Sequence, residues 1–106
     1  MKVFTGDSYT ITMGTNREEN AQILMDALPD DIWLHLEEGS SPHAILHVEG
    51  RVSSKMLRQA SHMIKNSSRA RKEDSVKVMW TRVKNVKPTS IIGEVEIEGE
   101  YNVFYL

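Results

Sequence analysis

The chain has 106 residues, a formal net charge of -2 and no cysteine. This length predicts one domain over residues 1–106, and the lack of cysteine excludes a disulfide framework, a thiol nucleophile and a zinc site with sulfur ligands. The sequence has no apolar run of about 18 residues and no signal-peptide core near its start, so we expect a cytoplasmic protein that does not bind membranes.

The first third of the chain predicts a strand hairpin followed by a helix. Apolar and polar residues alternate over residues 9–13, which predicts a strand paired with residues 2–5. Thr15 and Glu18 have the spacing of a capping box, so we expect a helix to begin there and to end before Pro29. Its expected buried face consists of Ala21, Leu24, Met25 and Leu28.

The most informative stretch is residues 31–48, where two alternating runs flank a turn at residues 39–42. Successive residues of a strand point to opposite faces. The register of this hairpin should place both aliphatic sets on one buried face, because a one-residue slip would mix them with polar residues. The opposite face then gathers a carboxylate, an indole and three imidazoles, from Asp31, Trp33, His35, His43 and His47.

The second half of the chain predicts another helix and further strands. Ser53 or Ser54 can cap a helix whose buried stripe consists of Met56, Leu57, Ala60, Met63 and Ile64. Alternation predicts a strand over residues 76–81 and a terminal hairpin over residues 95–105. Together these elements predict an α+β fold, with a mostly antiparallel sheet and two helices packed on one face.

The charged residues are strongly segregated along the chain. Residues 1–50 hold two basic and nine acidic residues, whereas residues 51–88 hold eleven basic and two acidic ones. Segregation of this kind within one domain is typical of a surface that binds a polyanion, most often nucleic acid. The alternative is that these side chains only keep a helix and a strand soluble.

The segment from Asp31 to His35, followed after a serine-bearing loop by Ser41, Pro42 and His43, resembles the signature of the NFACT-R family, the RNA-binding module of ribosome quality-control proteins. The resemblance covers roughly residues 9 to 97. Two departures are a threonine at position 15, where many members carry arginine, and Pro42 within the usual small-Ser-His run. Flanking segments that also fit are Met13 to Asn16, Glu19 and Asn20, Ala60, Asn66 to Arg71, Lys84 to Pro88, and Gly93.

The resemblance implies RNA as the partner, either tRNA or rRNA, in the context of a ribosomal subunit or a quality-control complex. Trp33 can stack on an unpaired base if it is partly exposed, although a core position is an equal alternative. His35 and His43 are expected to contact phosphate or sugar, and the basic residues to follow the RNA backbone. The full set of expected RNA contacts is Asn16, Asn20, Trp33, His35, Ser41, His43, Arg58, Lys65, Arg69, Arg71, Lys84 and Lys87.

Two other classes of function stay open, a protein-interaction adaptor that docks on a ribosomal or nucleic-acid-processing complex, and a DNA-binding module. Three imidazoles with Asp31 could supply zinc ligands, but alternate strand residues stand roughly 7 Å apart, which strains a tetrahedral site. We therefore expect no metal and no cofactor. A glycine-rich phosphate loop and the HExxH, GxSxG and CxxC motifs are all missing, so the sequence predicts a binding module rather than an enzyme. The oligomeric state stays open.

Overall fold

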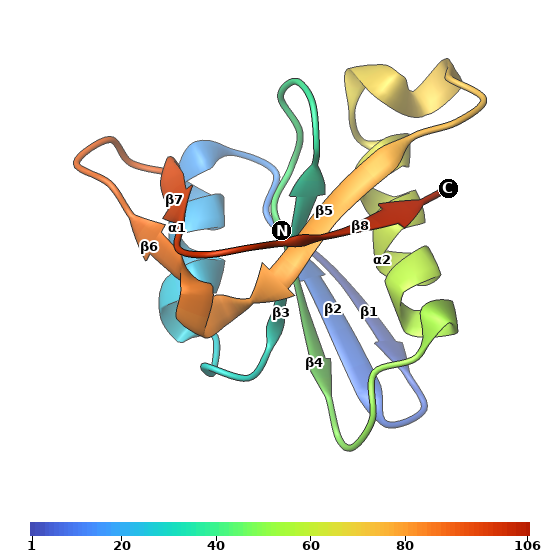
Figure 1. The fold of residues 1–106 in the computed structure, drawn as a ribbon, viewed down its shortest axis with the longest axis horizontal. Helices are drawn as coiled ribbons and strands as arrows, with labels where there is room; N and C mark the ends of the chain where they lie inside the picture. The colour runs from blue at the N-terminus through green and yellow to red at the C-terminus, as the bar shows by residue number, and fades with distance from the viewer.

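The computed structural model describes residues 1–106 as an α+β fold, in which an antiparallel sheet lies between two helices (Figure 1). The strand order of the six-stranded sheet is β1-β2-β4-β3-β5-β8, and each neighbouring pair is antiparallel. The strands of this sheet are β1 (Lys2–Gly6), β2 (Tyr9–Met13), β3 (Ile32–Leu36), β4 (Ala44–Val48), β5 (Lys77–Arg82) and β8 (Asn102–Tyr105).

A second, two-stranded sheet and four helical segments complete the fold. Strands β6 (Val86–Pro88) and β7 (Val95–Ile97) pair with each other and form the small sheet. The helices are α1 (Arg17–Asp26) and α2 (Ser54–Asn66), with short 3-10 helices η1 (Arg69–Lys72) and η2 (Val83–Asn85). Neither α-helix is long and apolar enough to cross a membrane. The strand pairing and the helices confirm the predicted α+β class and mostly antiparallel sheet.

The register between β3 and β4 is the one that the alternation predicts. Ile32 lies opposite Leu46, and Leu34 lies opposite Ala44. These four side chains are fully buried in one cluster with Leu57, Ala60 and Ile64 of α2. The side chain of Ser53 caps α2 by accepting a hydrogen bond from the backbone N–H of Met56 at 3.3 Å.

The two helices cover opposite faces of the sheet, not one face as the sequence predicts. Ile23 and Leu24 of α1 pack with Trp33 and Ile45, in a cluster separate from the one that contains the buried residues of α2. The alternation predicted a polar face here, but its two large apolar side chains must be shielded from water, and α1 packs over them. The predicted buried face of α1 is also wrong in part, because Met25 and Leu28 are exposed.

The predicted terminal hairpin does not form. β7 pairs with β6, whereas β8 crosses to the main sheet and pairs with β5 (Figure 1). The turn at Gly99, with φ at +79°, is thus a connection between two sheets. Strand pairing between segments far apart in sequence leaves no local signal, which explains why the alternation alone gives the wrong partner.

Ser61 of α2 offers a test of how this core is packed. Its hydroxyl is the one buried side-chain polar atom in the chain without a hydrogen-bond partner. Ser61→Ala should raise the free energy of unfolding by about 1 kcal/mol, because it removes an unsatisfied polar group and adds a better helix former. Urea unfolding measures the change, and the exposed Ser54→Ala is the control. A less stable Ser61→Ala protein would contradict the packing described here.

Candidate nucleic-acid interface

A hydrogen bond between Trp33 and His43 forms the centre of the candidate site. The indole Nε1–H of Trp33 in β3 donates to Nδ1 of His43, the residue before β4, at 3.2 Å. Trp33 is 2 % exposed and belongs to the cluster that α1 covers. The expectation that its indole stacks on a base is therefore wrong, since a buried ring offers no free face. The alternative of a core position is the one observed.

His35 lies against both of these rings. Its imidazole is stacked on the Trp33 indole with ring centroids 5.7 Å apart, and it meets the His43 ring edge-on at 5.0 Å. Nδ1 of His35 is 2.6 Å from the carbonyl oxygen of Leu36. A carbonyl only accepts, so this nitrogen carries the proton in the neutral ring.

Burial keeps both imidazoles neutral. Desolvation, with a smaller contribution from the neighbouring His35, lowers the pKa of His43 from 6.5 to about 4. Desolvation also lowers the pKa of His35, against a smaller opposing effect of its bond to Leu36. Neither ring is charged at pH 7, so the electrostatic basis for the predicted phosphate contact is missing.

Three polar residues of the predicted contact set hold the backbone around these rings. Asn20 accepts a hydrogen bond from the backbone N–H of His43 at 3.2 Å, and Ser41 accepts one from the N–H of Leu36 at 3.1 Å. Asn16 caps α1 by accepting from the N–H of Glu19 at 2.8 Å. Their side chains fix the loop and helix start beside the imidazoles.

A cavity of about 450 Å³ opens beside His35 and His43. One wall comes from β7, which approaches α1 through Gly93. At Gly93, φ is +81° and an added Cβ would lie 2.6 Å from the Cβ of Arg17. Nine residues that line this cavity are outside the predicted contact set: Leu36, Glu37, Gly39, Ser40, Met79, Gly93, Glu94, Val95 and Ile97. Met79 lies opposite His35 through the pairing of β5 with β3, a long-range pairing that leaves no local signal in the sequence.

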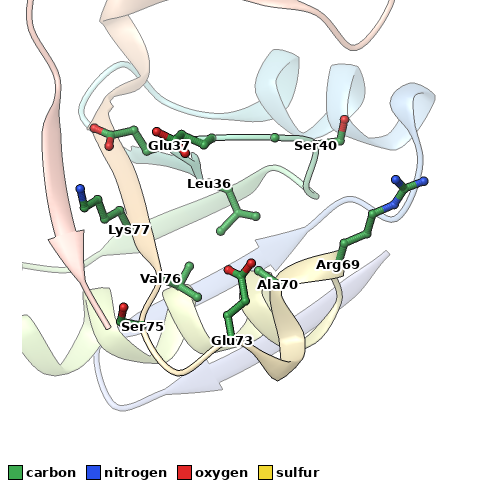
Figure 2. A pocket seen from close by; sticks show the side chains of 11 residues that line it. Leu36, Glu37, Ser40, Arg69, Ala70, Glu73, Ser75, Val76 and Lys77 are labelled. Carbon is green, nitrogen blue, oxygen red and sulfur yellow. The ribbon is translucent and has the colours of Figure 1, made fainter.

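A larger cavity, of about 740 Å³, lies on the other side of the β3–β4 loop (Figure 2). Arg69 and Lys77 line it together with three carboxylates, those of Glu37, Glu38 and Glu73. Figure 2 shows the Glu73 carboxylate pointing toward β3, and the Arg69 guanidinium extending away from Glu73. The loop residues Gly39 and Ser40 line both cavities and so separate them.

The predicted basic strip is divided between two sides of the molecule. Lys84 and Lys87 lie on η2 and β6, on the side of α1 and far from η1 (Figure 1). Lys84 is also 3.9 Å from Asp30. The remaining cations, which we call the basic surface, have no carboxylate within 4.0 Å: Lys55, Arg58, Lys65, Arg69, Arg71 and Lys72 of α2 and η1.

His47 belongs to a separate cluster at the other end of the hairpin. Its Nδ1 is 2.7 Å from Asp31, its Nε2 is 2.9 Å from Glu49, and both carboxylates raise its pKa. The structure has no group of three potential ligands placed to hold a metal ion. The face that the sequence assigned to five polar and aromatic residues is thus two distinct sites.

Comparison with known proteins identifies the family. The family model described as "NFACT protein RNA binding domain" matches residues 1–103. This chain therefore belongs to the NFACT RNA-binding domain family, as the motif around Trp33 indicated.

Curated relatives and a solved structure agree with this assignment. The chain is 32% identical over 89 residues to coiled-coil domain-containing protein 25 of Mus musculus, covering 78% of this chain and 43% of the relative. The homolog of Dictyostelium discoideum is 28% identical over 106 residues, covering 92% and 52%. The chain thus spans about half the length of the curated relatives that it matches.

The solved structure is that of the C-terminal part of the fibronectin/fibrinogen-binding protein from Streptococcus suis. It superposes with a TM-score of 0.87 at 18% sequence identity, covering 98% of this chain and 43% of that chain. The similarity concerns the fold alone.

Substitution of Trp33 tests whether the indole is structural. Trp33→Ala should lower the free energy of unfolding by about 3–5 kcal/mol, because it leaves a large cavity under α1. Trp33→Phe should cost less, about 1–3 kcal/mol, since a ring remains but Nδ1 of His43 loses its donor. Urea unfolding measures both. A Trp33→Ala protein of unchanged stability with weakened RNA binding would instead support the stacking interpretation.

The lowered imidazole pKa values predict loss of stability in acid. Between pH 6.5 and about 4 the unfolded chain binds protons that folded His35 and His43 do not. The free energy of unfolding should therefore decrease as the pH is lowered through this window. The raised pKa of His47 acts at higher pH and with opposite sign. Urea unfolding across this range should show a flatter pH profile for the His35→Asn/His43→Asn protein. Parallel profiles would contradict neutral, buried imidazoles.

Proposed function

We propose that this domain binds structured RNA such as tRNA in the cytoplasm, in translation or ribosome quality control. Membership of an RNA-binding domain family supports the RNA-binding part of the proposal. The observation that carries the mode of binding is the basic surface, whose six cations have no acidic partner within 4.0 Å. Unpaired cations gathered on one helix and the segment after it are suited to phosphates, because binding releases counterions from the RNA.

The geometry of α2 supports contact along a stretch of RNA backbone. Arg58 and Lys65 lie on the same face of α2, two turns apart. After α2 the chain soon enters η1, which carries Arg69 and Arg71. The Arg58 guanidinium lies 5.3 Å from the centre of the Phe104 ring, which holds it near the sheet edge. A ribosomal subunit or a quality-control complex would supply the RNA in this proposal.

Salt dependence of binding tests the proposal. Arg69→Ala/Arg71→Ala should weaken RNA binding and reduce the slope of log affinity against log salt by about one to two units, because each lost phosphate contact contributes roughly 0.7 to 0.9. Lys84→Ala/Lys87→Ala removes the same charge from the other side of the molecule and should leave the slope nearly unchanged. Fluorescence anisotropy with labelled tRNA over a range of salt concentrations measures both.

Three outcomes would contradict the proposal. Equal slopes for the two double variants would separate binding from the basic surface. Tighter binding to double-stranded DNA than to tRNA would favour the DNA-binding alternative. Absence of salt-dependent binding to any nucleic acid would favour a protein-interaction adaptor whose basic surface faces an acidic partner.

A further inference from the structure

The cavity beside His35 and His43 has the wrong charge for a phosphate. No lysine or arginine lines the cavity, and its charged lining residues are Glu37 and Glu94. With both imidazoles neutral, an incoming phosphate would meet only negative charge. The charge of the lining therefore favours an uncharged or cationic group over a phosphate.

The two imidazoles offer the cavity one donor and one acceptor. Nδ1 of His43 accepts from Trp33, so the neutral ring must carry its proton on Nε2. Nδ1 of His35 donates to Leu36, which leaves Nε2 of His35 as an acceptor. Neither Nε2 atom has a hydrogen-bond partner in the chain. Because Ser61 Oγ is the one fully buried side-chain polar atom without a partner, neither nitrogen is completely sealed from solvent.

Apolar side chains form part of the remaining lining, together with Asn20, Ser40 and Ser41 and the two glutamates. Met79 of β5 and Val95 and Ile97 of β7 lie around the cavity and are all partly exposed. Planar aromatic rings bind well between apolar side chains when their polar edge finds hydrogen-bond partners. A volume of about 450 Å³ leaves room for one such ring system with its attached sugar.

We propose that this cavity receives one unpaired nucleobase of the bound RNA. The edge of the base pairs with Nε2–H of His43 and with Nε2 of His35, and its faces contact the apolar lining. The Watson–Crick edge of every base presents a donor next to an acceptor, and unpaired RNA bases are recognised through such edges. The inference rests on the RNA-binding function proposed above and adds the part of the RNA that the cavity binds.

The β3–β4 loop connects this cavity with the basic surface. Gly39 and Ser40 line the cavity on one side of the loop, and the same residues face Arg69 on the other. An RNA strand held by a phosphate at Arg69 passes close to this loop, so a neighbouring base can turn into the cavity. The basic surface then captures any RNA, while the cavity requires an unpaired base.

The test compares a short single-stranded RNA with the same ribose-phosphate chain lacking bases. The base-bearing RNA should bind the wild-type protein about tenfold more tightly, the effect of two added hydrogen bonds. The His35→Asn/His43→Asn variant should remove this preference without changing the salt slope. Its side-chain amides can still donate to Leu36 and accept from Trp33, but the Nε2 atoms are gone. His62→Asn, on the exposed face of α2, is the matched control.

The wild-type comparison needs no variant and is decisive even if the double variant is unstable. Equal affinity for the two RNAs, with normal salt dependence, would overturn the base-binding cavity and leave the proposed function intact. A preference for bases that survives in the double variant would also overturn it. Loss of salt-dependent binding to both RNAs would instead contradict the proposed function. As a second measurement, nitrogen-15 NMR should show Nε2 shifts of both imidazoles only with the base-bearing RNA.

Discussion

The antiparallel pairing of β3 with β4 is the constraint on which the rest of the structure depends. Because side chains alternate, one register gives a wholly aliphatic face for α2 and places Trp33, His35 and His43 together on the other. The bond from Trp33 Nε1 to His43 Nδ1 then has two effects at once. It satisfies the indole N–H in the core, and it fixes the proton of His43 on the outward nitrogen.

That arrangement separates two kinds of electrostatic environment only one loop apart. The six cations of the basic surface have no acidic partner within 4.0 Å, and ionic strength strongly changes the attraction of such cations to phosphate. Around His35 and His43, burial removes the charge from the imidazoles and leaves carboxylates as the only ions. The hydrogen bonds proposed for the cavity are short-ranged and would be little affected by salt. In the proposed binding mode, affinity and selectivity therefore come from different physical terms.

Local periodicity explains what could be predicted from the sequence. The period of two fixed the β3–β4 register and the set of residues on each face, and the stripe from Leu57 to Ile64 identified the buried side of α2. Three features depended on long-range packing and were predicted wrongly: the face that α1 covers, the partner of β8, and the position of Lys84 and Lys87 relative to η1. Nothing in the local sequence from Val95 to Glu98 indicates that β7 pairs with β6 outside the main sheet and lines the cavity.

The site residues illustrate the same limit in chemical terms. Residue type identified His35 and His43, but their protonation depends on burial by β7 and α1, which only the assembled fold provides. Two imidazoles on the face that also carries Ile45 conflict with simple core packing, since polar rings lose hydration there and retain one unpartnered nitrogen each. Conflicts between local composition and packing concentrate at functional sites. The cost of desolvation at His35 and His43 is therefore best understood as the consequence of holding a neutral donor and acceptor at the mouth of a cavity.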